Sequence, residues 1–121
     1  MVVKEWRGDL PVEYVNRREV SDILGGQGPG VLQNVLMLLQ NRLRAEKWPL
    51  IKVIVSPEVD PDVPDWEGLS LKLIFDCPFD QADQALQHLY PELDAFTRTL
   101  ESKDATFFTK VFSIDVDTTG L

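Results

Sequence analysis

The chain has 121 residues, of which 44% are hydrophobic and 26% charged, a length that suits one globular domain and is too short for two. The formal net charge of -8 repels phosphate backbones, so it disfavours unspecific nucleic-acid binding and leaves a basic protein partner open. No apolar run approaches the roughly 20 residues of a membrane span, and the start of the chain lacks the basic-then-apolar layout of a secretory signal. The one cysteine, Cys77, excludes an internal disulfide. We expect a cytoplasmic domain over residues 1–121 that contacts neither nucleic acid nor membrane.

The first thirty residues are expected to form a segment ahead of the core, which is assigned to residues 31–116. Residues 1–6 are too few to decide whether they form a strand. Loose helical spacing after Pro11 predicts one or two short helices up to residue 24. The glycine-rich residues 25–30 (GGQGPG) lack the Lys-Ser/Thr pair that a phosphate-binding loop requires, so they are predicted to be a joint between two helices.

The clearest helix is predicted over residues 31–47. Its apolar side chains recur at the spacing of one helical face, and they are Leu32, Val35, Leu36, Leu39 and Leu43. Two strands with alternating apolar side chains are predicted next, over residues 50–56 and 69–76. The connector between them has about a dozen residues and three prolines, which suits an antiparallel hairpin with a long loop.

A second long helix is predicted to begin at Pro78. Pro91 interrupts its apolar stripe and predicts a kink or a break near Tyr90. A polar turn over residues 101–106 and a final strand over residues 107–116 are predicted to follow. In that strand Lys110 would share the core-facing side with its apolar neighbours, and the pattern offers no physical reason for this.

These elements predict an α+β fold in which an antiparallel sheet of three or four strands packs on two long helices, with a small N-terminal helical segment. If residues 2–6 form a strand, the order becomes βαββαβ, the ferredoxin-like pattern. Otherwise the fold is a three-stranded antiparallel sheet with an N-terminal helical lobe. In the ferredoxin-like arrangement, one face of the sheet stays open.

No group of side chains in the sequence predicts catalysis, and no cofactor or metal ligand set is assigned. Cys77 and His88 would lie about 16 Å apart along a helix axis, whereas a catalytic dyad needs a separation of about 3 Å. The acidic connector from Glu58 to Glu67 lacks the glycine and the bidentate glutamate of a calcium-binding loop. Whether this connector binds an ion stays open.

The open sheet face is expected to mix lysines with apolar side chains, and exposed apolar patches often mark a partner surface. Trp66 in the acidic connector is a second candidate, because an aromatic side chain in a charged loop can anchor an interface. The candidate interface residues are Leu50, Lys52, Ile54, Trp66, Lys72 and Ile74.

Two hypotheses for function follow from this surface. The first is a non-enzymatic protein-interaction module that forms a homodimer or binds another protein, a basic one included. The alternative is a regulatory domain that binds a small anionic ligand on the open sheet face through Lys52 and Lys72.

Overall fold

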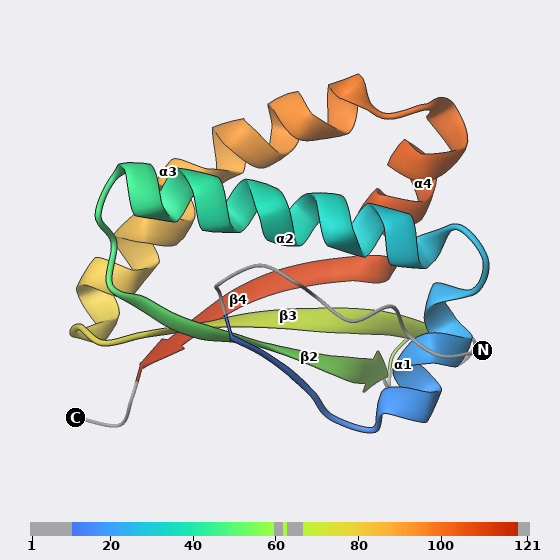
Figure 1. Cartoon of the computed structure of the whole chain (residues 1–121), viewed down its shortest axis with the longest axis horizontal. Coiled ribbons are helices and arrows are strands. Elements are labelled where there is room, and N and C mark those ends of the chain that lie inside the picture. Colours follow the sequence, from blue (N-terminus) through green and yellow to red (C-terminus); the bar gives the residue numbers. More distant parts are fainter. Residues whose placement is uncertain (1–10, 60–61, 63–66, 119–121) are drawn as a thin grey trace.

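The computed structural model describes residues 11–59, 62 and 67–118 of the chain. The described residues form four strands and four helices (Figure 1). In chain order these are β1 (Val12–Tyr14), α1 (Arg17–Leu24), α2 (Gly28–Ala45), β2 (Leu50–Val59), β3 (Glu67–Phe75), α3 (Phe79–Thr99), α4 (Ser102–Val111) and β4 (Phe112–Thr118).

The sheet is mixed, and its strand order is the same as the order along the chain, β1-β2-β3-β4. The central pair, β2 and β3, is antiparallel, as the hairpin prediction required. The two outer pairs, β1 with β2 and β3 with β4, are parallel. A parallel pair needs a long crossover between its strands, and here two helices fill each crossover, α1 with α2 and α3 with α4.

The α+β class is therefore confirmed, but the prediction of an antiparallel sheet is wrong. The ferredoxin-like arrangement is not confirmed either, because a split βαβ unit separates the two strands that its helix joins, whereas β1 and β2 are direct neighbours. Two features of the sheet account for this: residues 12–14 form a strand parallel to β2 instead of the predicted helix, and β4 is parallel to β3. The strand considered for residues 1–6 lies outside the described residues.

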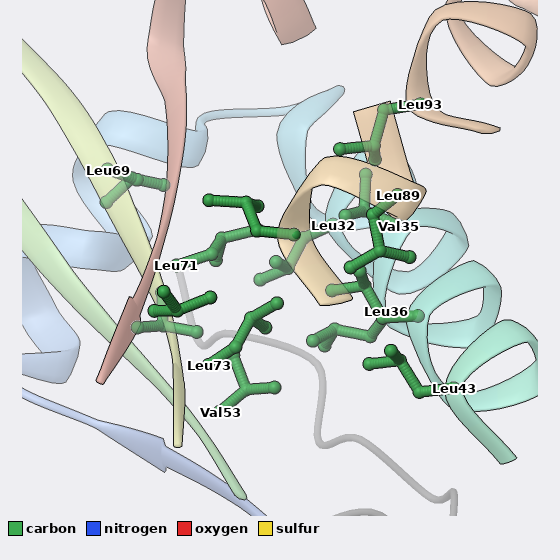
Figure 2. Packing of buried hydrophobic residues seen from close by; sticks show 14 of the residues in the cluster. Leu32, Val35, Leu36, Leu43, Val53, Leu69, Leu71, Leu73, Leu89 and Leu93 are labelled. Atoms are coloured by element: carbon green, nitrogen blue, oxygen red, sulfur yellow. The ribbon is translucent and has the colours of Figure 1, made fainter. Parts of the chain in front are cut away.

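The long helices α2 and α3 pack on one face of the sheet and enclose the hydrophobic core. Figure 2 shows leucines and a valine of β2 and β3 pointing toward apolar side chains of both helices. The residues labelled there on the two sides are Val53, Leu69, Leu71 and Leu73 from the sheet and Leu32, Val35, Leu36, Leu43, Leu89 and Leu93 from the helices. The apolar stripe predicted for residues 31–47 therefore faces the sheet.

A joint between two helices is found where it was predicted, but only residues 25–27 of the glycine-rich stretch form it. Helix α1 ends at Gly25, whose backbone has φ of 61° and whose N–H donates to the Ser21 carbonyl oxygen at 3.1 Å. A left-handed backbone of this kind is easiest for glycine, which has no Cβ. Helix α2 begins at Gly28, three residues earlier than the apolar spacing alone predicted.

The C-terminal region departs most from the predicted elements. Residues 102–111 form helix α4, where the sequence predicted a polar turn and the first half of a strand, and β4 begins only at Phe112. Lys110 therefore lies exposed on a helix and not on the core side of a strand. Pro91 lies within α3, which continues through it as one helix. Of the kink or break predicted near Tyr90, the break is therefore wrong.

Candidate functional site

One face of the sheet is left uncovered by the three helices α2, α3 and α4, which lie together over the opposite face (Figure 1). Helix α1 contacts β2 and β3 and contributes Val20 and Leu24 to the core. Successive side chains of a strand point to opposite faces, so alternate residues of all four strands form the uncovered face. This surface is the one on which the sequence analysis placed most of its candidates.

The uncovered face is predominantly polar and is arranged in rows across the strands. Ser56, Ser70 and Ser113 are neighbours in one row. The next row holds Glu13, Ile54, Lys72 and Asp115, and the row beyond it holds Lys52, Ile74 and Asp117. In these rows the lysines lie on the two central strands and the acidic side chains lie on the two outer strands, whereas Glu58, beyond the serine row, lies on the central strand β2.

The two lysines have different surroundings. The Nζ atom of Lys52 lies 3.0 Å from Oε1 of Glu13, so this ion pair links the short strand β1 to β2. Both side chains are partly exposed, and an exposed pair of this kind contributes at most about 1 kcal/mol to stability. Lys72 lies between Ile54 and Asp115 in its row.

The apolar candidates are divided between the two faces. Ile54 and Ile74 lie on the uncovered face, where Ile54 is half-buried and Ile74 is only 7% exposed. The prediction that Leu50 joins them is wrong, because Leu50 packs against the core. The pairing register shifts between Leu50 and Lys52, and a shift of one residue moves a side chain to the other face. Trp66 lies outside the described residues.

A hydrogen bond crosses the uncovered face over β3. The hydroxyl of Ser113 on β4 donates to Oε2 of Glu58 on β2 at 2.6 Å. The residue of β3 that pairs with Glu58 is Gly68, which has no side chain to fill the space between them. This bond connects an outer strand to its second neighbour.

Cys77 and His88 lie in different surroundings. Cys77 is 7% exposed at the turn between β3 and α3. Burial raises the pKa of its thiol, and the negative charge of Asp76 raises that pKa further. An unreactive buried thiol fits these surroundings better than a nucleophile.

His88 packs against Trp48. Its ring lies on the exposed side of α3, with the two ring centroids 6.0 Å apart. The indole N–H of Trp48 donates to Oε2 of Glu46 at 2.9 Å. Among the residues that the structure describes, there is no group of three or more Cys, His, Asp or Glu side chains that could hold a metal ion.

A groove between α3, α4 and β4 was not predicted from the sequence. It encloses about 270 Å³ and is lined by Tyr90, Leu93, Asp94, Thr97, Phe108, Thr109, Phe112 and Ile114. Residues 107–111 were predicted to be part of a strand, so a helix beside α3 was not expected there. The signal available in the sequence was Tyr90, an aromatic residue of the predicted helix, and in the structure its side chain is 48% exposed.

Comparisons with known proteins give no match: no family model, no curated protein and no solved structure resembles the chain. Among the described residues, no helix combines the length and the apolar character needed to cross a membrane.

Proposed function

We propose that the protein is a non-enzymatic interaction module that forms a homodimer through the uncovered face of its sheet. The observation that supports this proposal is the charge pattern of that face, with both lysines on the central strands and all acidic side chains except Glu58 on the outer ones. A two-fold symmetric interface brings one patch against a copy of itself, so the patch must be self-complementary. A surface that carries both signs of charge in separate strips meets this condition.

The centre of such an interface would be apolar. Ile54 and Ile74 lie on the two central strands, flanked by Lys52 and Lys72. In a stacked pair of sheets, the side chains of the two facing surfaces interdigitate. Ile54 would then fill the centre, since Ile74 is already almost fully buried within one copy. Lys72 of one copy would approach the carboxylate of Asp115 in the other.

Size-exclusion chromatography with light scattering at micromolar concentration tests this proposal. We expect twice the mass of the 13.8 kDa chain. Ile54→Glu should give a folded monomer, because it places a charge at the centre of the interface. Met37→Glu is the matched control, since Met37 is 54% exposed on α2, a helix on the other side of the sheet. A wild-type monomer throughout the concentration range, or a dimer unaffected by Ile54→Glu, contradicts the proposal.

A second candidate function is the binding of a small anionic ligand by Lys52 and Lys72, which lie diagonally on adjacent strands of the same face. The ion pair of Lys52 with Glu13 competes with this role. A thermal-shift measurement with citrate and with pyrophosphate separates the two functions. Ligand binding predicts a stabilisation that Lys72→Ala removes and that Lys103→Ala, at an exposed position of α4, leaves intact.

A further inference from the structure

Strand β4 is an outer strand of the sheet, and its free side carries backbone groups that the sheet does not use. Within the described residues, β4 pairs only with β3. The backbone N–H groups of Val116 and Thr118 donate at 2.8 Å to Oδ1 of the preceding residues, Asp115 and Asp117. Because N–H groups along a strand alternate between its two sides, the N–H of Ile114 also points to the free side.

The groove described above lies beside this edge. Phe112 and Ile114 contribute their core-facing side chains to it, and α3 contributes Tyr90 and Leu93. The hydroxyls of Thr97 and Thr109 also line the groove, but each already donates to a backbone carbonyl of its own helix. The carboxylate of Asp94 also lines the groove, and Arg98 pairs with it at 2.9 Å. A groove with mostly apolar walls and occupied polar groups suits an apolar side chain better than a polar ligand.

We propose that the free edge of β4 and the adjacent groove form a docking site for an extended peptide segment of another protein, which adds to the sheet as a fifth strand. Strand addition of this kind obtains affinity from main-chain hydrogen bonds and specificity from pockets for alternate side chains. Here the edge supplies the main-chain groups and the groove supplies the pocket. The proposal concerns the edge of the sheet and not its open face, although Asp115 lies at the border of both, and it does not depend on the homodimer.

The chemistry of the segment follows from the alternation of β4. Its even-numbered residues, such as Ile114, face the helices, and its odd-numbered residues face the uncovered side of the sheet. Neighbouring strands have the same alternation across their faces. A bound segment therefore places apolar side chains toward the groove and sets its other side chains beside Asp115 and Asp117. Basic residues are favoured at those positions, so the segment alternates basic and apolar residues.

Binding exchanges one set of hydrogen bonds for another. In the free protein, the carboxylates of Asp115 and Asp117 accept from N–H groups on the free side of β4. This arrangement protects an exposed edge from unspecific pairing. A carbonyl of the added strand can replace each carboxylate on its N–H group. The released carboxylates then form ion pairs with the basic side chains of the segment.

A second copy of the chain is a poorer occupant of this edge. Pairing β4 with β4 of another molecule brings the carboxylates of Asp115 and Asp117 close to their own equivalents, and like charges across strands are destabilising. The net charge of -8 adds to this repulsion over longer distances. A basic segment is instead attracted both by the carboxylates of Asp115 and Asp117 and by the net negative charge of the chain.

The test uses a fluorescein-labelled, acetylated seven-residue peptide that alternates Lys with Val or Ile. Its control has the same composition with the lysines grouped at one end, so that net charge is unchanged. Fluorescence anisotropy should show binding of the alternating peptide at least about tenfold tighter than that of the control, a difference of about 1.4 kcal/mol. Equal binding of the two peptides means general charge attraction and overturns the proposal.

N-methylated peptides test the main-chain pairing without changing the protein. One version carries methyl groups on the amides of the lysines, the other on those of the apolar residues. Only one side of an added strand pairs with β4, so one version should bind about as well as the parent and the other should lose at least about tenfold. If both versions bind equally well, or both fail, no strand is added at this edge.

Two pairs of variants locate the site on the protein. Ile114→Pro removes an outward N–H and should weaken binding at least about tenfold, whereas Ile114→Val keeps that N–H and should stay within about threefold of wild type. Asp115→Asn with Asp117→Asn should weaken binding at least about fivefold, whereas Asp22→Asn with Asp80→Asn changes the net charge equally and should not. Equal effects within either pair of variants overturn the proposal. If Ile114→Pro dissociates a dimer of the protein, the edge of β4 binds a second copy of the chain, and this result also overturns the proposal.

Discussion

Gly28 shows how one hydrogen atom in place of a methyl group allows three helices to meet. It is buried at the start of α2, and a Cβ built on it would lie 2.8 Å from Cβ of Leu24 and 2.9 Å from Cζ of Phe107. The first of these atoms is fixed to the backbone of α1 and cannot move without shifting that helix, whereas the second is the ring tip of Phe107 on α4, which can turn. The close approach explains why glycine is required here, although the backbone of Gly28 has no positive φ.

We predict that Gly28→Ala lowers the free energy of unfolding by about 1–3 kcal/mol, the usual cost of overpacking. The matched control is Gly30→Ala in the first turn of the same helix, where an added Cβ meets nothing within 4 Å. That substitution should instead stabilise the protein by about 0.5–1 kcal/mol through helix propensity. Urea denaturation of the two variants measures both values. Changes of the same sign would contradict this account of Gly28.

The hydroxyl of Tyr14 is buried, and none of the residues that the structure describes forms a hydrogen bond with it. Burial raises its pKa above the ordinary value of 10.0, and Arg17, whose guanidinium lies 4.9 Å from the ring centroid, opposes this increase. A buried hydroxyl without a partner costs free energy, so its removal need not destabilise the protein.

We predict that Tyr14→Phe unfolds at the same or a higher urea concentration than wild type at neutral pH. The raised pKa of Tyr14 adds a pH dependence. Above pH 10.0 the unfolded chain loses the phenolic proton while the folded chain retains it, so this group makes stability fall as pH rises. Tyr14→Phe should therefore lose less stability than wild type between neutral and strongly alkaline pH. A loss of more than about 1 kcal/mol at neutral pH would indicate a hydrogen-bond partner of this hydroxyl.

At the scale of elements, the sequence predicted the segments whose apolar side chains repeat clearly. Helix α2 and the strands β2 and β3 have a buried side at regular spacing, and their predicted positions are correct within a few residues. The spacing was less clear in residues 102–118, where phenylalanines and valines suit a strand and a helix equally. Tertiary contacts decide the outcome there, since Phe108 packs edge-on against Phe96 of α3.

The N-terminal error had a local signal that could have corrected it. Helix α1 begins after Asn16, whose side-chain oxygen accepts from the backbone N–H of Glu19 and whose amide donates to the Glu19 carboxylate at 2.7 Å. An N-cap residue followed three positions later by glutamate marks a helix start. Placing the start at Asn16 would have freed residues 12–14 to be a strand. The parallel pairing of that strand depends on β2 and could not be read from three residues.

The candidate site was predictable only in part, because the sequence shows the alternation within a strand but not the contacts between distant segments. Lys52, Lys72, Ile54 and Ile74 share the uncovered face as their parity predicted. Leu50 does not, because parity fails at the shift in register. The edge of β4 and its groove depend on which strand is outermost and on where α4 lies, and neither follows from a periodicity within one segment.

The whole molecule consists of two halves with the same order of elements, strand, helix, helix and strand, each with its two strands parallel. The halves meet at the antiparallel pair β2 and β3. Their apolar side chains enter one cluster, since Leu36 from the first half and Leu71 and Leu89 from the second all belong to it. One shared core implies that neither half retains its packing when the other unfolds.

We therefore predict a single unfolding transition, which can be tested by changing one half and observing the other. Leu36→Ala in α2 should lower the free energy of unfolding by about 2–5 kcal/mol, because it leaves a cavity at a fully buried position. The readout is the reaction of Cys77, in the second half, with a thiol reagent during a urea titration. Cys77 is buried in the folded protein and its thiol has a raised pKa, so it should react only after unfolding. Leu36→Ala should lower the urea midpoint of this reaction as much as the midpoint measured by circular dichroism.

Met37→Ala, at the exposed neighbouring position, should change neither midpoint appreciably. If Cys77 kept its wild-type midpoint in Leu36→Ala while circular dichroism showed an earlier loss of helix, the two halves would unfold separately and the shared core would not couple them.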